Sequence, residues 1–201
     1  MVKDQSHPDA RVARTRGQLK RALLSLLNEK SFSEIRIKEI AERAQVNRVT
    51  YYDHFASKEE LLAELLDEVL GEYGDIIVGM PRRPLAQLPS SDLLKTIRLS
   101  VGHIRKHAEF YRIMLLGNGV PNFSNRLHDQ MSLSLHESLR RWGSPSADVS
   151  IDLFIDWIIG GAIGVYKFWL QGGLRQSEEE IAQQMLKITL ASGGVFGMKI
   201  V

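Results

Sequence analysis

Apolar residues recur along this chain at spacings of three and four, the period of an amphipathic helix. No segment has the alternating pattern of a strand, and the breaks between periodic segments are short and carry Gly, Pro, Asn or Ser. We therefore expect an all-α chain of about nine helices. The pattern places the first three at about 11–28, 37–43 and 47–54, the last counted from its cap residue. The fourth begins at 57 and ends at a proline-rich loop at 79–89. The remaining five lie at about 92–107, 109–116, 122–142, 147–171 and 177–191.

Local capping signals mark several of these helix starts. Asn47 is a favourable N-cap for the third helix. Ser57 with Glu60, and Ser177 with Glu180, have the spacing of a capping box.

Composition narrows the class of protein. The 201 residues are 44% hydrophobic and 25% charged, as in an ordinary globular protein, and the absence of cysteine excludes disulfides and thiolate metal sites. The first ten residues lack the apolar core of a signal peptide, so we expect a cytoplasmic protein. Residues 153–170 are almost continuously apolar, but Asp156 and Lys167 would be costly in hydrocarbon, which favours a buried helix over a membrane span.

Charge is distributed unevenly. Residues 10–58 carry eleven Lys and Arg against five Asp and Glu, whereas residues 59–201 carry fourteen against seventeen. A basic first quarter on a mildly acidic remainder suggests a polyanionic partner for the N-terminal part.

Residues 37–54 have the layout of a helix-turn-helix. Small Ala41 lies where the second helix must cross closely, and apolar Val46 closes the turn. Three short helices around a shared core are also what a generic helical bundle would show, so the layout alone leaves both interpretations open.

The side chains of the third helix favour DNA binding. Arg48, Val49 and Thr50 occupy its first turn, which enters the major groove first in this motif. Arginine can donate two hydrogen bonds to guanine, threonine can meet a base edge or phosphate, and valine can contact a thymine methyl group. Tyr51 and Phe55, four residues apart, are expected in the core.

Three further residues are spaced to contact the flanking phosphates: Tyr52, His54 and Lys58. Lys58 lies in the first turn of the next helix, where backbone N–H groups favour a phosphate. The alternatives are a surface histidine at 54 and an ordinary surface charge at 58.

The segment IRIKEIAERAQVNRVTYYDHFASKEELL, residues 35–62, resembles the DNA-binding region of the TetR family of bacterial transcriptional regulators. The string TYYDHFASK at 50–58 is long and specific, and the resemblance extends over about residues 10–66. It implies base reading by the residues at 48–50 and phosphate contacts by those at 52, 54 and 58, with a possible backbone contact from Lys38. We expect a helix-turn-helix domain with an N-terminal arm at 1–57 and a helical regulatory and dimerisation domain at 58–201.

Three positions depart from the family pattern. Ser31 stands where a helix-ending glycine is usual, and Gln45 where the turn often has glycine. A polar residue can adopt the left-handed conformation at modest cost, so neither forbids the fold. Arg36 replaces a common Thr or Ser cap, which puts a hydroxyl–phosphate contact there in doubt.

In the family, the C-terminal part forms a homodimer and encloses a small-molecule site. Helix-borne small and apolar residues fit the dimer role, a purely intramolecular core being the alternative. The candidates for the dimer interface are Gly160, Gly161, Gly164, Phe168, Ile181, Met185 and Ile188. Aromatic and Met residues supply the pocket candidates, although such a stripe is also typical of plain core. These candidates are Phe110, Tyr111, Met114, Phe123, Trp142, Trp157 and Trp169.

Two other classes of function stay open. One is a metal-binding helical protein or metal-dependent hydrolase: His103 and His107, four apart on a helix, could hold a metal with help from Glu109, His128 or His136, although surface or capping histidines are favoured. A non-specific architectural DNA-binding protein is the other. No nucleophile elbow or phosphate-cradling glycine loop suggests an enzyme, and no cofactor is indicated. The favoured hypothesis is a dimeric, ligand-responsive repressor that binds double-stranded DNA at a palindromic operator, without a membrane partner.

Overall fold

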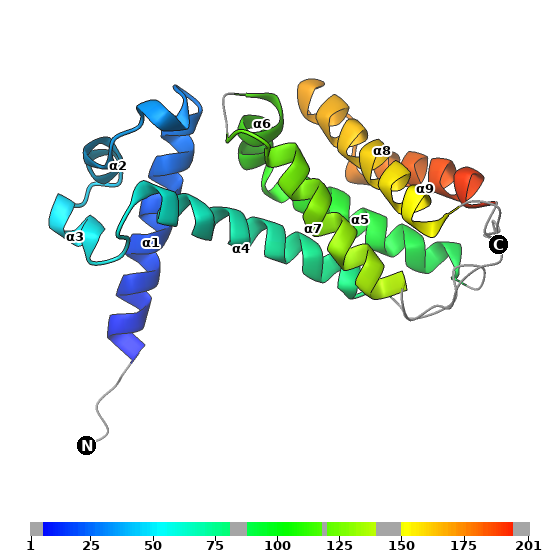
Figure 1. Cartoon of the computed structure of the whole chain (residues 1–201), viewed down its shortest axis with the longest axis horizontal. Coiled ribbons are helices and arrows are strands. Elements are labelled where there is room, and N and C mark those ends of the chain that lie inside the picture. Colours follow the sequence, from blue (N-terminus) through cyan, green and yellow to red (C-terminus); the bar gives the residue numbers. More distant parts are fainter. Residues whose placement is uncertain (1–5, 81–87, 118–119, 140–149, 195–201) are drawn as a thin grey trace, which may run out of the picture. The chain divides into compact units, whose positions relative to one another are not determined.

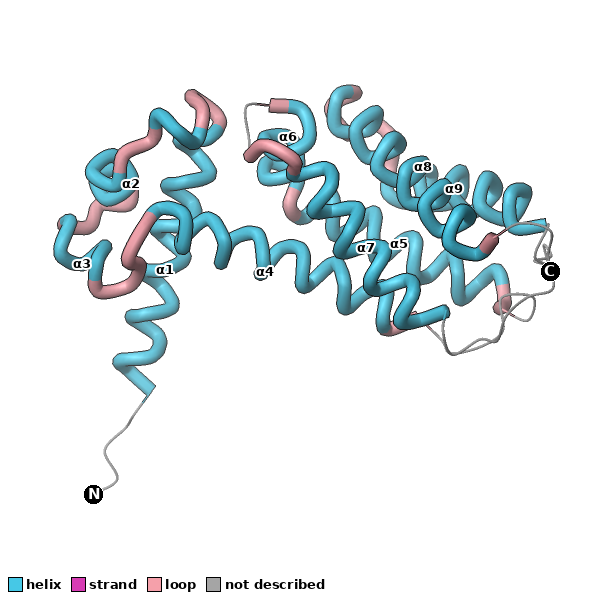
Figure 2. Tube along the Cα trace, viewed as in Figure 1, coloured by secondary structure: helices cyan, strands magenta, loops and turns pink. Residues whose placement is uncertain are grey.

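The computed structural model of the chain describes residues 6–80, 88–117, 120–139 and 150–194. Every regular element within these ranges is helical, which confirms the predicted all-α class (Figures 1 and 2). The elements in chain order are α1 (Ser6–Leu27), η1 (Phe32–Glu34), α2 (Ile37–Arg43), α3 (Arg48–Tyr52), α4 (Lys58–Val78), α5 (Ser90–Lys106), α6 (Ala108–Leu116), α7 (Phe123–Leu139), α8 (Ile151–Gln171) and α9 (Glu178–Gly193).

The observed bounds follow the apolar periodicity closely. The predicted range of α2 is reproduced, and α3 begins directly after its predicted cap Asn47 and ends two residues earlier than predicted. The predicted end of one helix near 142 and the predicted start of the next near 147 both lie within 140–149, outside the described residues.

Side-chain caps explain several of these starts. Asn47 Oδ1 accepts a hydrogen bond from the Thr50 amide at 2.7 Å. Ser177 Oγ accepts from the Glu180 amide at 3.2 Å, and the Glu180 carboxylate accepts from the Ser177 amide at 2.7 Å, completing the predicted capping box. Ser57 Oγ accepts from the Glu60 amide at 3.1 Å.

The two polar replacements of glycine behave differently. Gln45 has a φ of 57°, so it adopts the left-handed conformation in the turn between α2 and α3. Ser31 does not: its φ of −65° and ψ of 152° are extended, and it begins η1 instead. The Glu34 carboxylate accepts from the Ser31 amide at 3.1 Å and from its hydroxyl at 2.6 Å, so a capping geometry takes the place of a left-handed turn.

The chain divides into two compact units within α4, after Glu68. The sequence-based division after residue 57 falls at the start of α4, whose first turns bury Leu61 and Leu65 and group with the N-terminal helices. In this first unit α2 packs against both α1 and α3. The fully buried residues of its core include Leu19, Leu23, Ile40, Tyr51 and Phe55.

In the second unit α5 packs against α6 and α9, and α8 packs against α6 and α7. Large aromatic side chains fill its centre: Tyr73, Phe110, Tyr111, Phe123, Tyr166 and Trp169.

Helix α8 is long and apolar enough to cross a membrane by length and composition alone. One face of it nevertheless lies in the core, where Ile155, Ile159 and Trp169 are at most 1% exposed. A core helix satisfies the same length and composition test, so α8 gives no indication of a membrane protein.

Candidate nucleic-acid interface

Helix α3 is anchored by one aromatic residue. The Tyr51 ring is fully buried, packs against Phe55 at 6.1 Å between ring centroids, and its hydroxyl donates to the Ser57 carbonyl at 2.9 Å. Burial raises the pKa of this phenol, so it stays a neutral donor. With Tyr51 fixing one side of a five-residue helix, the opposite side is presented outward.

That outward side carries a guanidinium, an aliphatic group and a phenol. Val49 is 70% exposed and Tyr52 is 46% exposed, and Arg48 is also exposed. The Arg48 Nη2 donates to the Tyr52 hydroxyl at 3.1 Å, with the guanidinium 5.5 Å from the ring centroid. This pairing orders a planar two-hydrogen-bond donor on the surface, the geometry that guanine recognition requires.

The other predicted contact residues lie around this face. The Lys38 side chain is 75% exposed on α2 and pairs with Glu42 at 3.7 Å. Thr50 is half-buried. His54 is half-buried as well, and its carbonyl accepts from Arg16 Nη1 at 3.1 Å.

Arg16 links α1 to α4 beneath this surface. Its Nε donates to Glu64 at 3.1 Å, and its guanidinium lies 4.3 Å from the centroid of the Phe55 ring. Lys20 also pairs with Glu64, at 2.8 Å. Hydrogen bonds from the Arg16 guanidinium, and then from Lys20, lower the pKa of Glu64 to about 2.

Lys58 is the predicted contact whose environment differs most from expectation. Its ammonium donates to the carbonyls of Phe32 and Ile35, each at 2.8 Å, and to that of Ser33 at 3.3 Å. It also lies 4.6 Å from the centroid of the Phe32 ring. All three hydrogens are engaged within the protein, so Lys58 ties α4 to the η1 turn.

A cavity of about 200 Å³ lies in the second unit, among α4, α5, α7, α8 and α9. Trp157 lines it, together with Met185 and Ile188 from α9. Four other pocket candidates do not: Phe110, Tyr111, Met114 and Phe123 are at most 5% exposed and belong to the solid core, as does Trp169. Trp142 lies outside the described residues.

Sequence reasoning missed the polar part of this cavity. The hydroxyls of Tyr73 and Tyr166 are 2.9 Å apart and both rings line the cavity with Ser100. Burial raises the pKa of both phenols, so both stay neutral. Their apolar spacing on α4 and α8 is that of core residues, and no sequence signal joins them.

Helices α8 and α9 leave an uncovered apolar face. Gly160, Gly161 and Gly164 are exposed, and a Cβ at any of them would meet no atom within 4 Å. Phe168 is 61% exposed and Ile188 is 55% exposed. Of the other dimer candidates, Met185 is half-buried, whereas Ile181 is only 4% exposed. Ile181 therefore belongs to the core of its own unit, because it lies on the α9 side that packs inward.

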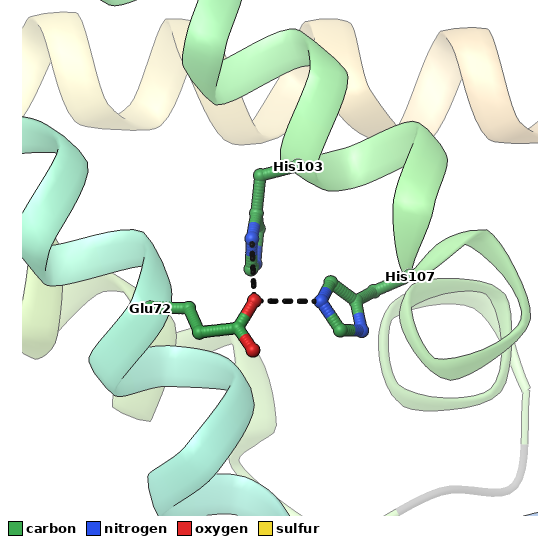
Figure 3. A group of neighbouring side chains, drawn as sticks. All are labelled: Glu72, His103 and His107. Carbon is green, nitrogen blue, oxygen red and sulfur yellow. Dashed lines mark hydrogen bonds and ion pairs between the residues drawn. The ribbon is translucent and has the colours of Figure 1, made fainter.

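His103 is buried, whereas His107 is the C-cap residue of α5, which is one of the roles favoured for these histidines. The side chain of His103 is 3% exposed, and Glu72 of α4 lies beside both rings rather than Glu109, His128 or His136 (Figure 3). Burial, and then the neighbouring His107, lowers the pKa of His103 to about 4, so its imidazole is neutral at pH 7.

Both units are similar to known proteins. A family model described as bacterial regulatory proteins of the tetR family matches residues 20–65, and one described as a transcriptional regulator C-terminal region matches residues 92–190. The HTH-type transcriptional regulator YxbF of Bacillus subtilis is 41% identical over 68 residues, 33% of this chain and 18% of that protein. The HTH-type transcriptional regulator Rv0767c of Mycobacterium tuberculosis is 25% identical over 145 residues, 71% of this chain and 65% of its own length. The matched region thus spans less than two thirds of either relative.

Solved structures agree on the fold. A tetR-family transcriptional regulator from Streptomyces coelicolor has a TM-score of 0.65 at 21% identity, over 90% of this chain and 81% of that one. The fatty acid degradation regulator FadR from Bacillus halodurans has a TM-score of 0.66 at 16% identity, over 90% and 96%. FadR from Bacillus subtilis, in complex with stearoyl-CoA, has a TM-score of 0.61 at 16% identity, over 90% and 98%.

The helix-turn-helix of α2 and α3, followed by a larger helical unit, defines a DNA-binding transcriptional regulator. The two family models together account for most of the chain. The chain belongs to the tetR family.

Proposed function

We propose that the protein is a dimeric, ligand-responsive repressor that binds a palindromic operator through the major groove and acts in the cytoplasm. The observation that carries this proposal is the outward face of α3, where the exposed Arg48 guanidinium is ordered by Tyr52 beside exposed Val49. A guanidinium so placed matches the two acceptors of guanine, and an exposed valine matches a thymine methyl group.

Phosphate contacts are assigned to a smaller set than the sequence suggested. Tyr52 keeps an exposed ring, and Lys38 keeps an ammonium that is tied only to Glu42 on its own helix. Both can reach backbone oxygens while α3 lies in the groove. Thr50 and His54 remain in the proposed interface as flanking contacts, and Lys58 supports the domain from within.

The glycine-bearing face of α8 supports the dimer. Glycine inside a helix costs about 1 kcal/mol of stability relative to alanine. The presence of three glycines within residues 160–164 of α8 therefore needs an explanation. No atom of the described residues approaches a Cβ at 160, 161 or 164, so the close approach that glycine permits is assigned to a second copy. Exposed Phe168 and Ile188 supply apolar area beside it. A two-fold axis through this face gives the operator its palindromic symmetry.

The cavity supports an apolar effector with a small uncharged polar group. None of its lining side chains among the described residues is charged, and its hydroxyls come from Tyr73, Tyr166, Ser100 and two threonines. The stearoyl-CoA complex of Bacillus subtilis FadR provides an example of an acyl ligand in a protein of similar fold. An acyl chain is one apolar group that such a lining accommodates.

Effector and operator are linked through the dimer. Trp157, Gly161 and Ile188 line the cavity and also lie on the uncovered α8–α9 face, so a ligand that repacks them changes the surface against which the second copy rests. If ligand and operator favour different spacings of the two recognition helices, each weakens the binding of the other.

The proposal is tested by selecting binding sites from a pool of random double-stranded DNA. We expect two inverted half-sites about one helical turn apart. Arg48→Ala should reduce affinity for the selected site by about 1–3 kcal/mol and relax the preference at one base pair in each half-site. Arg112→Ala, which removes the same charge from an exposed position of α6, should change neither the affinity for the selected site nor the base preference. An unchanged base preference in Arg48→Ala would refute the assignment.

A further inference from the structure

A compact group of possible metal ligands lies between α4 and α5 in the second unit, outside the cavity described above. Glu72 projects from α4 toward His103 of α5 and His107, the C-cap residue of α5, and one ligand atom of each residue lies within 4.8 Å of the others (Figure 3). The His107 Nε2 lies 3.0 Å from Glu72 Oε2, and the His103 Nδ1 lies 3.7 Å from the same oxygen. Donor atoms that share a tetrahedral ion at about 2.0–2.1 Å lie roughly 3.4 Å apart, so these separations bracket the required one.

The donor chemistry also fits. Two neutral imidazoles and one carboxylate are the ligands that Zn²⁺ and neighbouring divalent transition metals use when one coordination position stays open. His103 lies in the last turn of α5 and His107 caps that helix, and the two rings lie side by side with centroids 4.5 Å apart.

The ring of His103 has a hydrogen-bond partner for the nitrogen that would not bind the metal, as metal-bound histidines usually do. His103 Nε2 is 3.1 Å from the Tyr111 hydroxyl, and this contact is buried. If Nε2 carries the proton and donates it there, the lone pair of Nδ1 is directed toward Glu72, in the manner of an outer-shell hydrogen bond. The ring also hydrogen-bonds the backbone of Val69, a contact with which an ion competes.

A lysine forms an ion pair with the Glu72 carboxylate in the structure. Lys106 Nζ is 2.7 Å from Glu72 Oε2, and its side chain is 62% exposed. Because it is so exposed, it can leave the carboxylate without opening the core. A groove of about 620 Å³, lined in part by Glu72, His103 and Lys106, gives an ion a route from solvent.

We propose that Glu72, His103 and His107 bind a divalent transition-metal ion such as Zn²⁺, and that Lys106 holds the carboxylate when no ion is bound. Entry of the ion displaces the ammonium, and water completes the coordination. The site is independent of the DNA-binding proposal, since it uses no residue of α2 or α3.

The test uses the untagged full-length protein, stripped with a chelator, and titration with Zn²⁺ followed by calorimetry. Co²⁺ then reports the geometry through its visible absorption. We expect one ion per chain, at least tenfold weaker binding in His107→Ala and in Glu72→Gln, and unchanged binding in His136→Ala, which removes a partly exposed histidine paired with Asp152 instead. Tyr111→Phe should weaken binding by about 10- to 100-fold through loss of the outer partner.

The variant Lys106→Met distinguishes a metal-binding site from an ion-pair network that binds no metal. Removing the competing ammonium should tighten Zn²⁺ binding, whereas a network without metal function would gain nothing. The proposal is overturned if neither the wild-type protein nor Lys106→Met binds Zn²⁺. Equal affinity in wild type, His107→Ala and Glu72→Gln would also overturn it, because the ion would then lie elsewhere. Both variants alter partly exposed residues, so a circular-dichroism spectrum like that of the wild type is expected alongside.

Discussion

Replacement of Lys58 by methionine distinguishes an internal role from a phosphate contact. Methionine keeps the aliphatic stem but removes the ammonium that donates to the carbonyls of Phe32, Ser33 and Ile35. A hydrogen bond from a charged group contributes about 1.5–3 kcal/mol where it is buried, and less where solvent can replace it. Two of the three are partly buried and one is exposed, so we expect the DNA-binding unit to lose about 2–4 kcal/mol of unfolding free energy.

Urea unfolding followed by far-ultraviolet circular dichroism measures this loss. With a slope of about 2 kcal/mol per molar, the transition of the first unit should move down by about 1–2 M. Lys38→Met is the matched control, because its ammonium is exposed and contacts only Glu42; its transition should move by less than about 0.5 kcal/mol.

An equal midpoint for the two variants would refute the internal role. A phosphate contact makes the opposite prediction: Lys58→Met would unfold like the wild type, bind all DNA sequences more weakly to the same degree, and reduce the salt dependence of binding by about one phosphate.

Three further changes probe the fold and the dimer. Gln45→Gly should stabilise the first unit by about 0.5–1 kcal/mol in thermal unfolding, because the residue has a left-handed φ of 57°; a loss of stability would contradict the turn geometry. Gly164→Ala should raise helix stability but shift the mass measured by light scattering toward that of a monomer. Gly71→Ala, whose Cβ would likewise meet no atom within 4 Å, should leave that mass unchanged. A Gly164→Ala variant that remains dimeric would refute the role of this glycine in the dimer interface. Glu64→Gln should cost about 1–2 kcal/mol at pH 7 after allowance for partial exposure. Because the folded pKa of Glu64 is lowered to about 2, this difference should be fully present above pH 4.5 and shrink as the pH falls toward 2; a pH-independent difference would exclude the ion pair as its cause.

Local features of the fold could be predicted from the sequence. The bounds of α2, the cap at Asn47 and the capping box at Ser177 depend on residues within a few positions of one another. The left-handed turn at Gln45 could be anticipated because the family pattern often has glycine at this position.

Contacts between distant segments could not be predicted in the same way. Lys58 has the sequence position of a phosphate contact, and only the folded η1 turn shows three carbonyls around its ammonium. Glu72 lies on a different helix from His103 and His107, so no spacing rule connects them.

Apolar periodicity also fails to tell a solid core from a cavity wall or an uncovered face. Phe110 and Trp157 are both aromatic residues in apolar helices, yet the first is 2% exposed and the second lines a cavity. Ile181 and Ile188 lie on one helix at 4% and 55% exposure. The difference depends on which neighbouring helix covers each side of α9.

The central claim is that α3 reads a DNA sequence, and the ratio of two dissociation constants tests it most directly. Fluorescence anisotropy with the full-length protein would compare a selected palindromic site with a scrambled duplex of the same composition, at a low and a higher salt concentration. The account predicts a preference of at least about 10³-fold that persists at the higher salt, because base contacts do not depend on released counterions. Equal affinity for both duplexes, falling together as salt rises, would contradict it.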